Sequence, residues 1–196
     1  MVPLSDDKFV ILGGYSSGNW KKTTEYCSFI SGCTRTQNLP EEAYYPEAIK
    51  ISEDLIFVKG SGLHSWFFNL TDSLFYPLPD ALENLSSGSL GFINGHEVVI
   101  AGGSNTKKSQ IVDLDTYEWR FGPDLPVFDE LSMPAAVQFE DSFLVMGGWD
   151  TLDHRYQDRI FKFDPVNYEW EILPHKLQMA RSSFTAILVP SSYIPC

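Results

Sequence analysis

The chain has 196 residues, of which 43% are hydrophobic and 20% are charged, a balance typical of a folded globular protein. Its formal net charge is -12, from 26 acidic and 14 basic residues, so the chain repels phosphate backbones and we expect no nucleic-acid partner. No apolar run approaches the roughly 18 residues of a membrane span, and residues 1–7 lack the basic and apolar segments of a secretory signal. We therefore expect a cytoplasmic protein without membrane contact. The alternative is an extracellular one whose signal peptide is missing from this chain.

The three cysteines, Cys27, Cys33 and Cys196, are an odd and sparse set without a C-x-x-C pair. Such a set is neither a disulfide framework nor a zinc site, so we expect reduced, structural thiols. The four histidines, His64, His96, His154 and His175, have no metal-ligand spacing. No phosphate-binding or hydrolase motif is present, and the sequence predicts neither a metal nor a cofactor.

Three segments of the chain share one pattern, an apolar run that ends in Gly-Gly. They are residues 9–14 (FVILGG), 98–103 (VVIAGG) and 143–148 (FLVMGG). The second and third pairs are 45 residues apart, and the first and second are 89 apart, which is about two such periods. A degraded copy, residues 55–62 (LIFVKGSG), lies between them. The chain is therefore interpreted as four repeats of similar length.

Other features recur in phase with these pairs. A polar loop follows each pair, and then an apolar strand that ends at a turn-forming residue, Asn69, Asp115 or Asp164. An aromatic residue follows that turn, Phe75, Trp119 or Trp170, and a Pro-containing loop and a strand of small residues come next. Each unit thus contains four short strands, which we call a, b, c and d. Strand b ends at the Gly pair, strand c at the Asp or Asn, strand d carries the aromatic residue, and strand a follows the Pro loop. Four antiparallel strands per repeat predict an all-β propeller blade.

These motifs resemble the kelch repeat, in which a Gly-Gly pair closes strand b and an Asp and a Trp follow. The resemblance covers nearly the whole chain and is strongest in the third and fourth units. The residues that carry the repeat are Gly13, Gly14, Gly102, Gly103, Gly147, Gly148, Trp119, Asp164 and Trp170. The first unit has Cys33 or a neighbour in place of the Trp, and the second has lost the Gly pair. We expect a single domain, 1–196, with units of about 8–51, 54–93, 96–139 and 142–189.

In this interpretation the chain begins on strand b and ends on strand a. Two architectures follow. The last strand, 182–189, could pair with the first, 9–13, and close a four-bladed ring. Alternatively, the chain is an open arc of a larger propeller. Proteins of the kelch family usually have six or so blades, and this favours the open arc. An open arc would leave strand edges free for edge-to-edge self-association.

The loops between strands b and c and between d and a lie on one face of such a propeller and are the longer ones, so we expect the binding face there. Trp, Tyr and Arg dominate protein–protein hot spots, and the b–c loops combine them with much of the basic charge. The candidate partner-binding residues are Trp20, Lys21, Lys22, Lys107, Lys108, Trp149, His154, Arg155, Tyr156 and Arg181. The d–a loops are acidic, so a partner that carries both charges is expected.

The resemblance implies a non-catalytic module that binds a protein or peptide. Family members act as substrate-recognition parts of ubiquitin-ligase adaptors or bind actin, and both remain open. A propeller enzyme of the galactose-oxidase type is the catalytic alternative, but Tyr26 and Cys27 are neighbours whose side chains point to opposite faces of a strand. The glycosylation sequons at Asn69 and Asn84 matter only if the chain is secreted.

Overall fold

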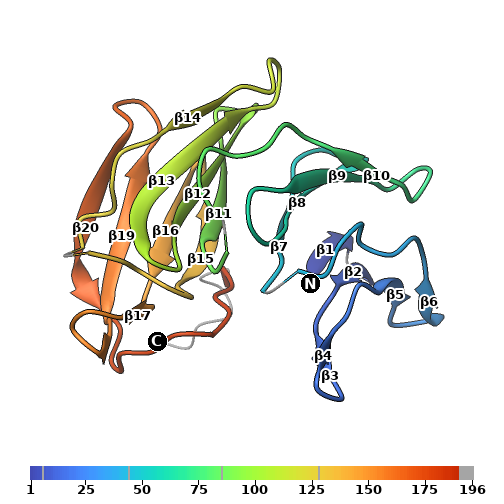
Figure 1. Ribbon diagram of the computed structural model, residues 1–196, viewed down its shortest axis with the longest axis horizontal. Helices are drawn as coiled ribbons and strands as arrows, with labels where there is room; N and C mark the ends of the chain where they lie inside the picture. The colour runs from blue at the N-terminus through green and yellow to red at the C-terminus, as the bar shows by residue number, and fades with distance from the viewer. Residues whose placement is uncertain (6, 44, 85, 128, 190–196) are drawn as a thin grey trace.

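The computed structural model describes residues 1–5, 7–43, 45–84, 86–127 and 129–189. The regular structure in these residues is β-strand, arranged as four four-stranded antiparallel sheets and two small hairpins. The four sheets follow one another along the chain and stand around a common centre (Figure 1). The protein is a four-bladed β-propeller, which confirms the fold predicted from the sequence. None of the described segments is a helix long and apolar enough to cross a lipid bilayer.

Each blade is a meander of four antiparallel strands, with strand a innermost and strand d outermost. The innermost strands of consecutive blades contact one another. In blades 1 and 2 the strands are β1 (Val2–Ser5), β2 (Lys8–Leu12), β5 (Thr24–Ser28) and β6 (Gly32–Arg35), then β7 (Glu47–Lys50), β8 (Leu55–Lys59), β9 (Ser65–Asn69) and β10 (Phe75–Pro77). In blades 3 and 4 they are β11 (Ser89–Ile93), β12 (Glu97–Gly103), β13 (Thr106–Asp113) and β14 (Trp119–Phe121), then β15 (Ala135–Phe139), β16 (Ser142–Met146), β19 (Arg159–Asp164) and β20 (Glu169–Lys176). The two hairpins, β3 (Tyr15–Ser16) with β4 (Asn19–Trp20) and β17 (Trp149–Asp150) with β18 (Arg155–Tyr156), lie in b–c loops.

The order of strands within a blade differs from the sequence prediction by one strand. Blade 1 begins on its own strand a, β1, which pairs with β2, and β2 also pairs with β5. Both edges of β2 are therefore occupied, and residues 182–189 do not make the pairing with residues 9–13 on which the closed-ring alternative depended. The strand β1 escaped notice because four residues that include Pro3 carry too little alternation to predict a strand.

Hydrophobic clusters fill the three interfaces between consecutive blades. Val10, Leu12, Val58 and Phe68 belong to the cluster between blades 1 and 2. The second cluster, with Phe57 and Val98, joins blades 2 and 3. The third joins blades 3 and 4 through residues that include Val99, Phe143 and Phe163. Strand alternation explains the pattern, since successive side chains of a central strand point to opposite neighbours.

Polar side chains add a second connection between blades 3 and 4 and between blades 2 and 3. The Trp119 indole nitrogen donates a hydrogen bond to the Pro79 carbonyl, 2.9 Å away, and that of Trp170 donates to the Pro123 carbonyl at 3.1 Å. Both tryptophans lie partly buried on strand d and reach the Pro loop that leaves the preceding blade. The repeated Trp therefore serves contact between blades, which explains its place in the pattern.

The fourth interface, between blade 4 and blade 1, differs from the other three. Among the described residues no hydrophobic cluster joins these two blades. Leu144, Met146 and Ile160 alternate along β16 and β19 with core residues and therefore point away from blade 3, toward this seam. All three are only partly buried. We call the outward side of blade 4 formed by these residues the seam face.

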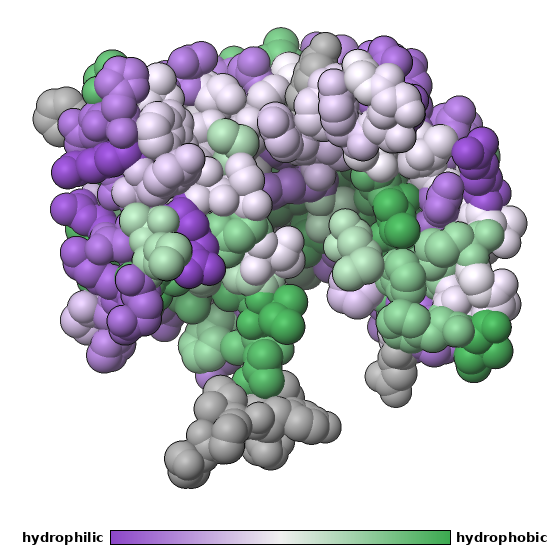
Figure 2. Space-filling model, turned by 90° about the horizontal axis from the view of Figure 1, so that it is seen from below, coloured by the Kyte–Doolittle hydropathy of each residue, from purple (hydrophilic) through white to green (hydrophobic). Residues whose placement is uncertain are grey.

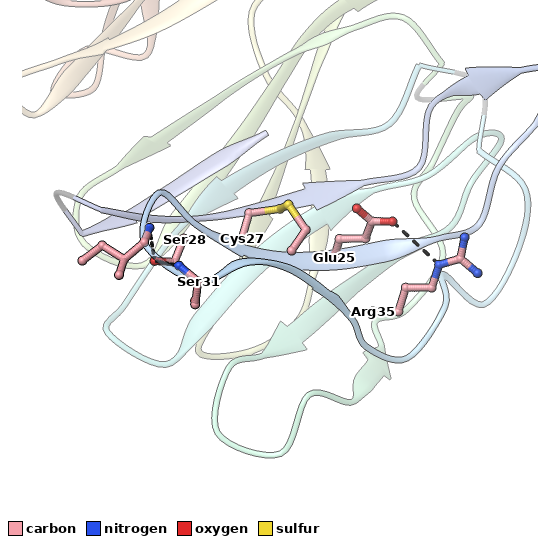
Figure 3. The surroundings of a disulfide bond; sticks show 7 residues. Glu25, Cys27, Ser28, Ser31 and Arg35 are labelled. Atoms are coloured by element: carbon pink, nitrogen blue, oxygen red, sulfur yellow. Dashed lines mark hydrogen bonds and ion pairs between the residues drawn. A yellow bond between two sulfur atoms is a disulfide. The ribbon is translucent and has the colours of Figure 1, made fainter.

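The structure contains a disulfide between Cys27 and Cys33 (Figure 3), so the expectation of reduced thiols was wrong for this pair. The two residues lie directly opposite each other on β5 and β6, with their Cα atoms 4.0 Å apart. The hairpin between them brings together two cysteines that are only six positions apart, and neighbouring strands place opposed side chains at disulfide distance. Cys196 lies outside the described residues.

Candidate functional site

The b–c and d–a loops emerge on one side of the propeller, which we call the loop face. In Figure 1 the hairpins β3–β4 and β17–β18 lie at the same lower edge of the molecule. Figure 2 looks onto this side and shows hydrophobic residues around a central hollow, with hydrophilic residues along the left edge. The face expected from the sequence is therefore the one that carries both hairpins.

The b–c loop of blade 4 is built around an aromatic pair. Trp149 and Tyr156 lie opposite each other in the β17–β18 hairpin, with ring centroids 4.8 Å apart in an edge-on arrangement. The His154 ring lies 6.5 Å from that of Trp149. Asp150 is buried and organises the loop: its carboxylate accepts hydrogen bonds from the Asp153 amide and the Gln157 side chain. The structure thus brings Trp149, His154 and Tyr156 together, as predicted.

Arg155 is exposed beside this pair. Its guanidinium contacts the Asp153 carboxylate at 2.6 Å, so part of its charge is already neutralised within the loop. Arg181 comes close through its backbone, since its amide donates to the Gln157 carbonyl and its carbonyl accepts from Gly148. The Arg181 guanidinium lies 5.9 Å from the Phe184 ring, and its Nε donates to the Met179 carbonyl.

The b–c loop of blade 1 repeats the same design with other residues. Tyr15 and Trp20 lie opposite each other in the β3–β4 hairpin, with ring centroids 5.0 Å apart. Ser17 and Gly18 between them both have positive φ, as a two-residue hairpin turn requires. The Trp20 ring also contacts Tyr45 of the d–a loop at 5.1 Å. The sequence identified Trp20 but missed Tyr15 and Tyr45, because only the strand pairing shows that these rings meet.

The candidate lysines of the b–c loops differ in their contacts, which include hydrogen bonds to the backbone and an ion pair. Lys22 donates from its ammonium group to the Pro40 carbonyl, and Lys21 is held by its backbone amide, which donates to the Gly14 carbonyl. Lys108 pairs with Glu83 of the d–a loop and lies over the Phe121 ring. Lys107 is partly buried. The expected mixture of basic b–c loops and acidic d–a loops is present, and part of it is joined by internal ion pairs.

His64 shows the same pairing on blade 2. Its Nδ1 lies 2.7 Å from the Glu41 carboxylate and its Nε2 lies 3.8 Å from Asp80. The hydrogen bond and charge of Glu41 raise the pKa of His64 above its usual value. The imidazole therefore links the d–a loop of blade 1 to that of blade 2, a contact between loops that sequence spacing did not predict.

A cavity of about 390 Å³ opens at the centre of the propeller. The first residues of β7 and β15 line it, together with Leu12 and with Phe184 of the C-terminal segment. Glu47 also lines the cavity, and burial raises the pKa of its carboxyl group, while the charge of Lys59 opposes that shift. Lys59 is fully buried opposite Glu47 and donates a 2.8 Å hydrogen bond to the Gly88 carbonyl. This charged pair was not predicted from the sequence, because Lys59 stands where the other repeats have the first Gly of the pair.

The opposite face carries a polar cluster where side chains of His96, Glu97 and Asp113 come within 4.8 Å of one another. Glu97 is buried, and both oxygens of its carboxylate have partners within the protein. Arg120 contacts the carboxylate at 2.7 Å, and Tyr168 donates a 2.6 Å hydrogen bond to it. Asp113 caps the following turn by accepting from the amides of Asp115 and Thr116. These contacts give the cluster a structural role.

Comparison with known proteins agrees with this architecture. Residues 131–176 match the family model described as the Kelch motif, and this span covers blade 4 from the loop before β15 to the end of β20. A search of curated proteins found no significant match. The chain is a four-bladed β-propeller whose fourth blade matches the Kelch motif.

Proposed function

We propose that this propeller is a non-catalytic interaction module that binds a protein or peptide partner through its loop face. The observation that carries the proposal is the pair of hairpins with opposed Trp and Tyr rings, β3–β4 and β17–β18, on the same side of the molecule. Tyr15 is 61% exposed and Tyr156 is 54% exposed, so both offer rigid aromatic area to a partner at low entropic cost.

The partner's chemistry follows from the charges around these rings. Exposed Arg155 and Arg181 lie near the blade 4 pair, and acidic d–a loops lie between the blades. A peptide with an apolar centre and charges of both signs at its ends matches this arrangement. Attachment to a ubiquitin ligase or to actin has no support in the residues of this face.

The disulfide bears on where such a partner is found. Disulfides persist in oxidising compartments and are rare in the cytosol, so the Cys27–Cys33 bond favours the extracellular alternative over the cytoplasmic one. A partner is therefore to be sought first among extracellular and luminal proteins.

A footprint tests the proposal. Affinity capture on the full chain, with and without oxidising conditions, supplies a partner, and hydrogen exchange is then compared in the free and bound states. Protection of residues 15–20 and 149–156, with none at the c–d turns 115–118 and 165–168, is the expected result. Protection of the c–d turns alone would place the partner on the other face and refute the proposal.

A further inference from the structure

The segment after blade 4 repeats the backbone path that leads into blades 2, 3 and 4. Tyr45, Ser87 and Met133 each have φ between 52° and 62° and stand two residues before β7, β11 and β15. Ser183 has φ 55°. By the same count, a fifth strand a begins at Thr185.

The hydrogen bonds around Ser183 match those of the preceding blade. The Ser183 amide donates to the Met133 carbonyl, as the Met133 amide donates to the Ser87 carbonyl, both at 3.0 Å. The Gly148 amide donates to the Arg181 carbonyl at 2.8 Å, as Gly103 donates to Leu131 at 2.9 Å. Residues 181–184 are therefore docked on blade 4 as a blade-to-blade crossover, and the same contact already joins blades 3 and 4.

The strand that this crossover would begin has no partner. Residues 185–189 (TAILV) are uncharged and, after Thr185, apolar, yet no strand pairs with them among the described residues. Ile187 is 76% exposed. The equivalent residue of blade 4 is Val137, which lies opposite Leu144 of strand b. An exposed apolar strand with a free edge accepts another strand through main-chain hydrogen bonds.

Two further features beside residues 185–189 lack the contacts that strand b makes in the other blades. In blades 3 and 4 the residue after the Gly pair donates to the d–a loop, Ser104 to the Ser86 carbonyl and Trp149 to the Ser132 carbonyl. The equivalent acceptor next to residues 185–189 is the Ser182 carbonyl, which has no such donor in the described part of the chain. Beside it lies the seam face, with partly buried Leu144, Met146 and Ile160.

We propose that residues 182–189 accept a β-strand from a partner protein, which completes a fifth blade on the seam face. The occupant is defined by the repeat itself: an apolar strand of about five residues that runs antiparallel to residues 185–189, ends in Gly-Gly, and donates from the next amide to Ser182. This site is separate from the hairpins of the loop face, so its failure would leave the proposed function untouched.

The test uses the full chain and a labelled peptide with the sequence of residues 141–150 (DSFLVMGGWD), the strand b of blade 4. We expect saturable binding by fluorescence anisotropy, and none with a scrambled peptide. Ile187→Pro removes a strand amide at an exposed position and should weaken binding at least tenfold with an unchanged melting curve. Met179→Pro, a proline at an exposed site outside the strand, is the matched control and should bind normally.

Register gives a sharper readout. In a Cys196→Ser background with oxidised glutathione as the oxidant, Ile187→Cys should form a disulfide with a peptide that carries Cys in place of Leu144 about tenfold faster than with one that carries Cys in place of Val145. Equal rates, unsaturable binding, or equal binding by Ile187→Pro would overturn the proposal. So would spontaneous cross-linking of Ile187→Cys chains to each other that the peptide does not inhibit, which would assign the site to a second copy. Binding that appears only after removal of residues 190–196 would assign it to the chain's own end.

Discussion

The Tyr168 hydroxyl donates a 2.6 Å hydrogen bond to the buried carboxylate of Glu97 and thereby joins blade 4 to blade 3. Asn94 donates to the same oxygen, and Arg120 contacts the other one while it stacks over the Tyr168 ring. Burial disfavours the charged form of Glu97, but these hydrogen bonds and the Arg120 charge outweigh it and lower the pKa of the carboxyl group.

Tyr168→Phe should therefore reduce stability by about 1.5 kcal/mol, the usual worth of a hydrogen bond to a charged group. Because the Glu97 pKa is lowered on folding, its contribution is present above the unfolded-state pKa and is lost as the pH falls through the folded-state pKa. The stability difference between the parent and Tyr168→Phe should accordingly shrink in acid, as measured by urea unfolding from pH 7 to pH 3. A difference that grows in acid would contradict this account of Glu97.

Trp170 combines a ring contact with a hydrogen bond, and two substitutions separate them. Its ring lies 5.0 Å from that of Phe163 and 5.5 Å from that of Phe143, and its Nε1 reaches the Pro123 carbonyl. Trp170→Ala should cost about 3 kcal/mol through lost packing, while Trp170→Phe, which keeps one aromatic ring but loses the donor, should cost less, about 1 kcal/mol. Thermal unfolding of both variants is the measurement. Equal losses would mean that the ring itself contributes nothing to the contact between blades.

The Gly pairs can be tested by comparing two glycines with similar backbone conformations. Gly14 has φ 123° and open space where a Cβ would be, whereas Gly148 has φ 105° and a Cβ there would lie 2.7 Å from Leu131. Gly14→Ala should show backbone strain alone, about 1 kcal/mol. Gly148→Ala should lose more, because crowding against blade 3 adds to the strain, and Gly148→Val more again. If Gly14→Ala proves the more damaging in thermal melts, the assigned packing at Gly148 is wrong.

The disulfide predicts a specific thiol count. Unfolded but unreduced protein should take up one maleimide per chain, at Cys196, and reduced protein should take up three, as measured by intact mass. Reduction should also lower the melting temperature, since the bond closes the β5–β6 hairpin and restricts the unfolded chain. Uptake of three labels without reductant would show that Cys27 and Cys33 are free in solution.

The sequence predicted the blades because the repeat depends on local signals: Gly pairs at strand ends, Asp at turns and apolar alternation. What it missed depends on pairing between distant or register-matched residues. Cys27 and Cys33 are opposed only because β5 and β6 pair, and Lys59 is satisfied by Gly88, in the next blade. The position at which each blade begins was predicted one strand too late, because β1 is short and contains Pro3.

The candidate site divides in the same way. Trp149, His154 and Tyr156 fall within eight positions of one loop, so their clustering was predictable. The matching pair in blade 1 was not, because Tyr15 and Trp20 meet only through a hairpin that also brings Trp20 against Tyr45 of another loop.

The central claim is that a partner docks on the loop face, and the affinity of paired variants for the captured partner tests it most directly. Trp149→Ala with Arg155→Ala should weaken binding about tenfold or more, because aromatic and Arg anchors carry most interface energy, and raised salt should reduce the remaining difference. Thr116→Ala with Val166→Ala, on exposed turns of the opposite face, should bind like the parent. If the Thr116/Val166 pair abolishes binding and the Trp149/Arg155 pair leaves it intact, with both proteins folded, the loop face is not the binding surface.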